Sequence, residues 1–201
     1  NALFFAGHGQ RLLPSDAGRT TMCPTELFSE PDEAPSLHLL PIETRRREES
    51  LARLKHMPIE WCRVALDPGD PRQLHDSLKK LTETKSMAAV DAIELGLWDS
   101  EDPSEYHLLR DDGSVEVPAW RYARVNYPHP LLQAGLTILD TPGLNALGAE
   151  PELTLSVLPS AHAVMFLLAT DTGVTRSDLE IWHKHVHRHG NFHVAVLNKI
   201  D

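Results

Sequence analysis

Cysteine and long apolar runs are scarce in this chain of 201 residues. Two cysteines, Cys23 and Cys62, provide neither a disulfide framework nor a zinc site, so we expect a reducing, cytoplasmic environment. The longest uninterrupted apolar run, residues 163–169, is far shorter than the ~20 residues that a membrane-spanning helix needs. We therefore expect no transmembrane segment and no signal peptide.

Positive charge is also in short supply. Lysine and arginine total 19 against 29 acidic residues, which gives a formal net charge of −10. This balance argues against nonspecific nucleic-acid binding, and it gives no electrostatic help to a membrane contact by the chain as a whole. We expect no nucleic-acid partner, and any contact with lipid must use a local patch or another region of the protein.

The stretch from Leu136 to Gly143 carries the first candidate site. An apolar run with β-branched residues predicts a short buried strand that ends at Asp140, directly before Thr-Pro-Gly. Ligands of open α/β sheets bind beyond the carboxyl ends of strands, where a carboxylate can hold hydrated Mg²⁺. The backbone N–H of Gly143, with no side chain in the way, suits contact with a terminal phosphate.

The second candidate site is the tetrapeptide Asn198-Lys199-Ile200-Asp201, which follows a strand predicted over 191–197. Before it, the chain has a buried strand at 163–169 and a helix predicted from Thr175 to His189, with Thr175 and Asp178 spaced as in a capping box. Strand, helix and strand with motifs at the strand ends predict an α/β fold with a doubly wound, mostly parallel sheet and helices on both faces.

Between the start of the chain and Asp140, the sequence predicts a mixture of loops, strands and helices. Proline and glycine predict an extended loop over 11–26. We expect strands at 36–42, 59–66 and 120–127, helices at 42–57, about 72–81 and 86–97, and a hairpin over 106–117. The helices suggest a helical insertion spanning 43–100. The short connection from 127 to 136 predicts that the strands on either side are antiparallel neighbours.

A run of alternating histidines precedes Gly190, and its members are His183, His185, His187 and His189. A tract of this kind can bind a transition metal. On a helix, however, a spacing of two places successive side chains on different faces, and imidazoles also suit the partial negative charge at a helix carboxyl end. The second interpretation is favoured, and the metal site stays open as an alternative.

The order of these motifs, with Thr21 on an upstream loop, resembles GTP-binding P-loop proteins and, in closer detail, the dynamin superfamily of large GTPases. Bacterial dynamin-like proteins are the most similar members. The resemblance covers about half the chain and is carried by three stretches: Leu12 to Glu26, Pro130 to Leu144, and Leu158 to Thr175. It implies a P-loop NTPase-type fold and hydrolysis of GTP with Mg²⁺.

Site roles follow from the resemblance. Thr21, with Thr20 as the fallback, would ligate Mg²⁺ through its hydroxyl and help to position the attacking water, while Asp140 would hold the ion through a water. The Gly143 N–H would contact the γ-phosphate. Asn198 and Asp201 would recognise guanine, and the stem of Lys199 would cover the base. The Asp201 carboxylate would accept hydrogen bonds from N1–H and the exocyclic amine of guanine. Adenine lacks this pair of donors, which favours GTP over ATP.

Two departures from the usual GTPase pattern matter. The phosphate-binding sequence G-x-x-x-x-G-K-[ST] is absent, and we expect it just upstream of Asn1, so that residues 1–201 alone would be a partial GTPase domain with little or no activity. Leu144 stands where Ras-like GTPases carry a water-orienting glutamine. Dynamin-like proteins share this absence and resemble a class in which dimerisation completes the site, where Arg19 could add a positive charge.

The sequence thus leads to one main hypothesis and two alternatives. The main hypothesis is a GTPase domain of a dynamin-like protein that is activated by self-association and serves membrane remodelling or tethering. Such a protein would be cytoplasmic and peripheral to a membrane, with lipid contacts made by regions outside these residues. The alternatives are a monomeric regulatory GTPase that switches a protein partner, and a nucleotide-binding scaffold without hydrolysis.

Overall fold

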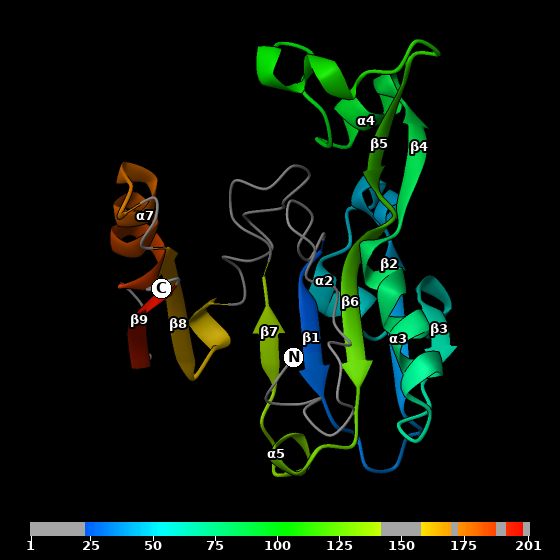
Figure 1. Cartoon of the computed structure of the whole chain (residues 1–201), viewed down its shortest axis with the longest axis vertical. Helices are drawn as coiled ribbons and strands as arrows, with labels where there is room; N and C mark the ends of the chain where they lie inside the picture. The colour runs from blue at the N-terminus through cyan, green and yellow to red at the C-terminus, as the bar shows by residue number, and fades with distance from the viewer. Residues whose placement is uncertain (1–22, 142–157, 170–172, 188–191, 199–201) are drawn as a thin grey trace. The chain divides into compact units, whose positions relative to one another are not determined.

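A computed structural model describes residues 23–141, 158–169, 173–187 and 192–198 (Figure 1). The chain divides into two compact units, Asn1–Ala149 and Glu150–Asp201, and each is considered by itself. In the part of the chain that the structure describes, no helix has the length and hydropathy needed to cross a membrane.

The first unit contains a five-stranded sheet in the order β3-β2-β6-β1-β7. Its strands are β1 (Thr25–Phe28), β2 (Ser36–Pro41), β3 (Cys62–Ala65), β6 (Trp120–Asn126) and β7 (Ile138–Asp140). Only β1 and β6 run parallel, whereas the β3–β2, β2–β6 and β1–β7 pairs are antiparallel. The sheet is therefore mixed, and β1 has one parallel and one antiparallel neighbour.

Strand register sorts the side chains into rows that cross all five strands. One row is apolar and consists of Ile138, Leu27, Val125, Leu37 and Val64. The adjacent row points to the other face, because side chains alternate along a strand. That row consists of Leu139, Glu26, Arg124, His38 and Arg63. The sheet thus has one apolar face and one face with a line of charged groups.

The apolar face is covered by helix α3 (Pro71–Lys79) and by the short helix α5 (Pro130–Gln133). Asp70 caps α3 by accepting from the backbone N–H groups of Arg72 and Gln73. Leu74, Leu78 and Leu132 are buried against the sheet in one core. This face is the main hydrophobic core of the unit.

Segment 42–60 lies beside the sheet and forms three short elements. They are the 3₁₀ turn η2 (Ile42–Arg46), helix α2 (Leu51–Leu54) and the 3₁₀ turn η3 (Pro58–Glu60). Leu54 is fully buried, and its carbonyl accepts a hydrogen bond from the indole N–H of Trp61 at 2.8 Å. The end of α2 is thereby fixed beside the first residues of β3.

A two-stranded ribbon extends from one end of the sheet, because β5 (Ser114–Pro118) continues into β6 with only Ala119 between them (Figure 1). Its partner is β4 (Thr84–Ala88), which follows the turn η4 (Lys80–Thr82). Helix α4 (Ala89–Glu94) and η5 (Pro103–Leu108) lie at the far end of the ribbon. A second, smaller core joins this region to Ile42 and includes Ala92, Leu97 and Val117.

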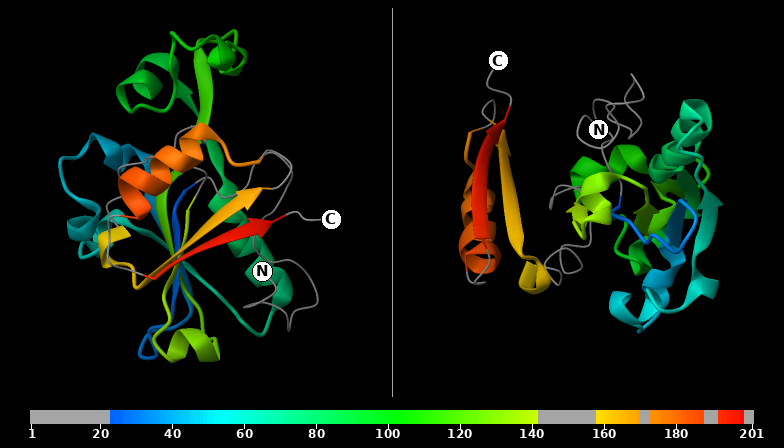
Figure 2. Two further views of the ribbon diagram at one scale, coloured as in Figure 1. Left: turned by 90° about the vertical axis from the view of Figure 1, so that its left-hand side faces the viewer. Right: turned by 90° about the horizontal axis from the view of Figure 1, so that it is seen from below.

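The second unit is built on a parallel pair, β8 (Ala163–Ala169) and β9 (Phe192–Asn198), with helix α7 (Arg176–Ile181) connecting them (Figure 2). A 3₁₀ turn, η6 (Leu158–Ser160), precedes β8, and a π-helical turn, η7 (Trp182–Val186), extends α7. Trp182 packs edge-on against Phe166 at 5.7 Å and against His193 at 6.1 Å between ring centroids. These contacts hold the helical segment on one face of the pair.

Several expectations are confirmed. The capping box at the start of α7 is present, since the Thr175 hydroxyl accepts from the Asp178 backbone N–H and the Asp178 carboxylate accepts from that of Thr175. The parallel β8–β9 pair is likewise as expected. In α3 and the turn after it, the predicted apolar residues Leu74, Leu78 and Leu81 are buried.

Other expectations are wrong. The five-stranded sheet is mostly antiparallel rather than mostly parallel, and the doubly wound arrangement is not confirmed. The strands β6 and β7 are not neighbours, because β1 lies between them and pairs with both. The loop expected over 11–26 ends earlier than predicted, since Thr25 and Glu26 belong to β1.

Segment 43–100 is not purely helical. It contributes β3 to the main sheet and β4 to the ribbon, and the helix expected over 86–97 is the end of β4 followed by α4. The hairpin expected over 106–117 forms only around its turn, where Leu109 and Val115 make an isolated antiparallel bridge. Strand β5 pairs with β4 instead, and residues 103–108 form η5. Whether segment 43–100 is an insertion in the domain stays a prediction.

Candidate functional site

The first candidate site lies where β7 ends and β1 begins. Asp140 is the last residue of β7, is exposed, and stands in register with Thr25, the first residue of β1. Because the two strands are antiparallel, the chain entering β1 and the chain leaving β7 are at the same end of the sheet. The structure thus joins the segment after Thr21 to the strand that carries Asp140.

Thr25 anchors this junction from inside the core. Its side chain is buried, and its hydroxyl donates a hydrogen bond to the carbonyl oxygen of Cys23 at 3.1 Å. Cys23 is buried as well, and burial raises the pKa of its thiol to about 12 although the hydrogen bond with Thr25 acts in the opposite direction. Cys23 is therefore a packed apolar residue and has no role as a nucleophile at neutral pH.

A charged cluster lies on the opposite face, one residue further along β1. The carboxylate of Glu26 forms ion pairs with Lys55 of the α2 end and, at 3.4 Å, with the guanidinium Nε of Arg124 in β6. It also accepts a hydrogen bond from the hydroxyl of Tyr122 at 3.0 Å. The Lys55 ammonium lies 5.0 Å from the centroid of the Tyr122 ring, and Arg124 lies over the Phe28 ring at 4.3 Å.

The electrostatics of this Glu26 cluster favour a charged carboxylate. Burial by itself would raise the pKa of Glu26, but the hydrogen bond and charge of Lys55, with smaller contributions from Arg124 and Tyr122, hold that pKa below its ordinary value. Burial and the neighbouring carboxylate raise the pKa of Tyr122. At neutral pH the cluster thus holds an ionised carboxylate between two cations and a phenol that stays protonated.

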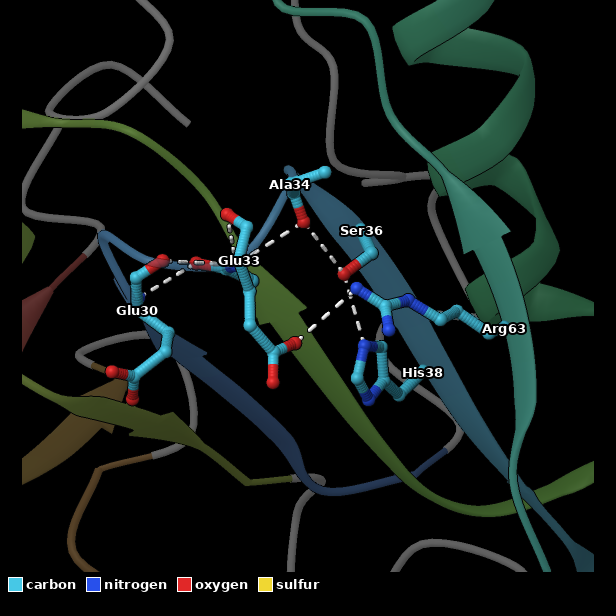
Figure 3. Close-up of polar contacts among 7 residues, drawn as sticks. Glu30, Glu33, Ala34, Ser36, His38 and Arg63 are labelled. Carbon is cyan, nitrogen blue, oxygen red and sulfur yellow. Dashed lines mark hydrogen bonds and ion pairs between the residues drawn. The ribbon is translucent and has the colours of Figure 1, made fainter. Parts of the chain in front are cut away.

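The loop between β1 and β2 is fixed by a buried amide. Asn126, the last residue of β6, accepts from the Glu30 backbone N–H at 2.8 Å and donates to the carbonyls of Glu33 and Ala34, both at 3.3 Å. Figure 3 shows these loop residues beside Ser36, His38 and Arg63. The end of β6 is therefore hydrogen-bonded to both sides of the loop that follows β1.

Ser36 and His38 resemble a nucleophile and a base, since the hydroxyl lies 2.9 Å from the imidazole Nε2 (Figure 3). Ser36 is buried, however, and its hydroxyl donates to the carbonyl of Ala34 at 3.1 Å. Burial and the charges of Arg63 and Arg124 lower the pKa of His38. A hydroxyl without access to substrate cannot attack one, so this pair is part of the sheet and not a catalytic site.

The second candidate site begins at the end of β9. Asn198 is the last residue of that strand, and its Cα is in register with that of Ala169 at the end of the parallel strand β8. The carboxyl ends of β8 and β9 therefore meet at one edge of their sheet. This is the position that the α/β pattern predicts for a ligand-binding loop.

Most of the predicted site residues lie outside the described part of the chain. They are Arg19, Thr20, Thr21, Gly143, Leu144, Lys199 and Asp201. Asp140 belongs to the first unit and Asn198 to the second. The assignments of Thr21, Asp140, Gly143, Asn198, Lys199 and Asp201 stay predictions.

Metal binding can be considered for the described residues alone. Within them, no three histidine, cysteine or acidic side chains are grouped so that they could hold a metal ion, and this includes His183, His185 and His187 of the histidine tract. Asp140 is an exposed carboxylate at a strand end, a hard oxygen ligand of the type that Mg²⁺ prefers. The donor chemistry of Asp140 fits an ion held by one carboxylate together with water and substrate phosphates.

The family of the chain follows from its similarity to known proteins. The dynamin family matches residues 7–200, nearly the whole chain. The chain belongs to the dynamin family. A P-loop NTPase α/β fold and a nucleotide-binding GTPase domain are what this membership implies.

Individual relatives agree with the family assignment. A bacterial dynamin-like protein from Nostoc punctiforme is 33% identical over 100 residues, which is 50% of this chain and 14% of that protein. The isoniazid-induced protein IniA from Mycobacterium tuberculosis is 45% identical over 60 residues, or 29% of this chain and 9% of that protein. The matched part of the chain thus spans only a small share of the length of each of these relatives.

The Glu26 cluster is the feature that sequence reasoning missed. Proline and glycine over 11–26 predict that Glu26 lies in a loop, and the helix expected over 42–57 gives Lys55 no particular partner. One signal was available: Tyr122 and Arg124 alternate with apolar residues along a predicted strand, which places a phenol and a cation on the same face. Their partner could not be named without the register of β1.

Proposed function

We propose that this chain is the GTP-binding and GTP-hydrolysing part of a dynamin-like large GTPase that converts GTP to GDP and phosphate with Mg²⁺. The observation that carries the proposal is the dynamin family match over residues 7–200. Two features of the fold support it, since Asp140 and Asn198 are each the last residue of a strand. Strand ends are where nucleotide-binding loops of α/β proteins begin.

The proposed phosphate side of the site consists of Thr21, Asp140 and Gly143. Asp140 would hold Mg²⁺ through a water molecule, and the Thr21 hydroxyl would be a direct ligand. The bound ion would neutralise charge on the phosphates. The Thr21 carbonyl would orient the attacking water, and the Gly143 N–H would donate to the γ-phosphate. The pairing of Thr25 with Asp140 supports this grouping, because Thr21 precedes Thr25 by four positions in the chain.

The proposed base side consists of Asn198, Lys199 and Asp201. Guanine presents two donors, N1–H and the exocyclic amine, to a carboxylate at position 201, while Asn198 would form a second polar contact with the base. The Lys199 stem would cover the ring. The position of Asn198 at the carboxyl end of β9 supports a base-binding loop that starts there.

Self-association is proposed because position 144 is leucine. With no glutamine at that position to orient water, groups from a second molecule would complete the site, and Arg19 is a candidate cation at the contact. A role in membrane remodelling or tethering is proposed from the resemblance to dynamin-like proteins alone, and its lipid contacts are assigned to regions outside this chain. The protein would then be cytoplasmic and peripheral to a membrane.

The test is GTP turnover by the full-length protein at a series of protein concentrations with Mg²⁺. We expect the rate per molecule to rise with concentration, because dimerisation would supply the missing groups. A rate per molecule that stays flat would favour a monomeric regulatory GTPase. Retained GTP binding without turnover at any concentration would favour a nucleotide-binding scaffold.

A further inference from the structure

Glu26 connects three separate parts of the first unit next to the proposed phosphate site. Its backbone lies between Arg124 of β6 and Leu139 of β7, and the preceding residue of β1 pairs with Asp140. Its carboxylate binds Lys55, which belongs to the end of α2 in segment 43–100. A single side chain therefore links a helix outside the core strands to the strand junction at Asp140.

The ion pairs of Glu26 are shielded enough from water to fix the relative positions of the elements that they join. The Glu26 side chain is 12% exposed, whereas the partners Lys55 and Arg124 are 29% and 24% exposed. Charges this far from water are weakly screened, and each bond to Glu26 fixes the position of β1 relative to another element. By contrast, the Arg63–Glu33 pair near the opposite edge of the sheet is about half exposed at both partners.

The Lys55 side of the cluster is held rigidly. Trp61 donates to the Leu54 carbonyl and also packs edge-on against Tyr122, with 6.4 Å between ring centroids. Lys55 follows Leu54 directly and lies over the same Tyr122 ring. The ammonium group is thus positioned by the end of α2 and by an aromatic pair, and not by the carboxylate alone.

Few main-chain hydrogen bonds hold strands β1 and β7 together. Strand β1 has four residues and β7 has three, so few ladder bonds hold them together. We propose that Glu26 is a positioning residue for the nucleotide site: bound to Lys55 and Arg124, it holds the start of β1 against the end of β7. It thereby places the chain that leads from Thr21 with respect to Asp140. This inference rests on the proposed GTPase function and assigns segment 43–100 a part in it.

The experiment uses the full-length protein and compares Lys55→Met with Lys55→Arg. Both retain a long side chain beside Tyr122, but only Lys55→Arg keeps the positive charge beside Glu26. Arg63→Met is the matched control, because it removes an exposed ion pair from the same face of the sheet, on β3, which is separated from β1 by two strands. The readouts are kcat and KM for GTP, affinity for a fluorescent GDP analogue, and the thermal midpoint.

We expect Lys55→Met to lower kcat about tenfold, since small misplacements of positioned groups have effects of this order or larger. Affinity for GDP should change less than about twofold, because the base and diphosphate contacts would be unaltered. Lys55→Arg should restore most of kcat, and Arg63→Met should resemble the unmodified protein. Tyr122→Phe removes only the hydroxyl bonded to Glu26 and offers a milder second variant, expected to lower kcat about threefold.

Other results would overturn the inference. A lower thermal midpoint with unchanged kcat in Lys55→Met and Tyr122→Phe would make the cluster a purely structural element. Equal losses in Lys55→Met and Arg63→Met would do the same. These results leave the proposed GTPase intact, since the unmodified protein still turns over GTP; absence of turnover in the unmodified protein would overturn both proposals.

Discussion

The two units place their motif residues in the same way but build different sheets around them. In the first unit, Asp140 ends a strand whose neighbour β1 runs antiparallel to it, within a mixed five-stranded sheet. In the second unit, Asn198 ends a strand whose neighbour β8 runs parallel. A polar residue directly after an apolar run therefore predicts the end of a strand and says little about the direction of the neighbouring strand.

The two units also differ in how completely their strands are covered. In the five-stranded sheet, Leu27 is 3% exposed beneath α3 and its neighbours. In the β8–β9 pair, the strands are apolar on both faces, yet Met165 is 68% exposed on the face turned away from Trp182. Apolar residues on both faces are typical of a parallel strand buried on both sides. The buried Leu27 is therefore expected to contribute more to stability than the exposed Met165.

The largest expected effect concerns the base side of the second unit. We predict that Asp201→Asn in the full-length protein shifts the preference between guanine and xanthine nucleotides by about 1,000-fold, because a site built around specific hydrogen bonds discriminates strongly against a mismatched partner. Competition binding with GDP and xanthosine diphosphate measures this ratio. Unchanged selectivity for guanine would mean that Asp201 does not bind the base, and the proposal that guanine binds at the end of β9 would lose its main support.

A stability comparison addresses the packing difference directly. Leu27→Ala should lower the free energy of unfolding by about 3 kcal/mol, as expected for truncating a buried leucine in a well-packed core. Met165→Ala should change it by less than about 0.5 kcal/mol, because the side chain is already exposed to water. Urea unfolding of the chain, followed by circular dichroism, gives both values. Equal losses would mean that Met165 is buried in solution.

The phosphate side is tested by the two adjacent threonines. Thr21→Ala should reduce GTP hydrolysis by about 30-fold with a smaller effect on GTP binding, since it removes a ligand whose contribution is greatest in the transition state. Thr20→Ala is the matched control and should have little effect on either quantity. If only Thr20→Ala suppresses hydrolysis, the assignment of Thr21 is wrong and the neighbouring hydroxyl takes its place.

The smallest expected effect is the pH dependence of the Glu26 cluster. Because the folded state lowers the pKa of Glu26 below its usual 4.5, the ionised carboxylate stabilises the fold above that pH. This contribution disappears as the pH falls through the lowered pKa. Glu26→Gln should cost about 1 kcal/mol at pH 7, a value reduced by the partial exposure of Lys55 and Arg124, and almost nothing in strong acid.

Urea unfolding at several pH values from 7 downward measures this dependence, with Glu33→Gln as the exposed control. Three charged or titratable groups face Glu26 directly, namely Lys55, Arg124 and Tyr122. The pKa of the Tyr122 phenol is raised by burial and by the Glu26 carboxylate, so the phenol stays protonated over this range. A constant cost of Glu26→Gln at all pH values would show that the carboxylate contributes through packing and not through its charge.

Helices and strands were predicted most accurately where a single sequence pattern was clear. The period of Leu74, Leu78 and Leu81 identified α3, and the Thr175–Asp178 spacing identified the start of α7. The region 84–97 was harder, because Val90 and Ile93 have helical spacing but are exposed, whereas the buried residue of α4 is Ala92. An apolar stripe predicts burial only if a partner element is available to cover it.

The positions of single candidate residues at strand ends could be predicted from the sequence, but the strands beside them could not. Asp140 and Asn198 were expected at strand ends and lie there. The position of β1 was missed because Pro24 suggested a loop, although a proline directly before a strand leaves the ladder intact. Without β1 between β6 and β7, neither the Thr25–Asp140 pairing nor the surroundings of Glu26 could be derived from the chain order.

The alternation between the apolar and charged rows has a further consequence for the register of β1. A slip of one residue would turn the Glu26 carboxylate toward Leu37 and Val125 and would expel Leu27 into the charged row. Desolvating that carboxylate without its cations would cost several kcal/mol. A one-residue slip of β1 is therefore strongly disfavoured, and its register fixes the point at which the preceding chain joins the sheet.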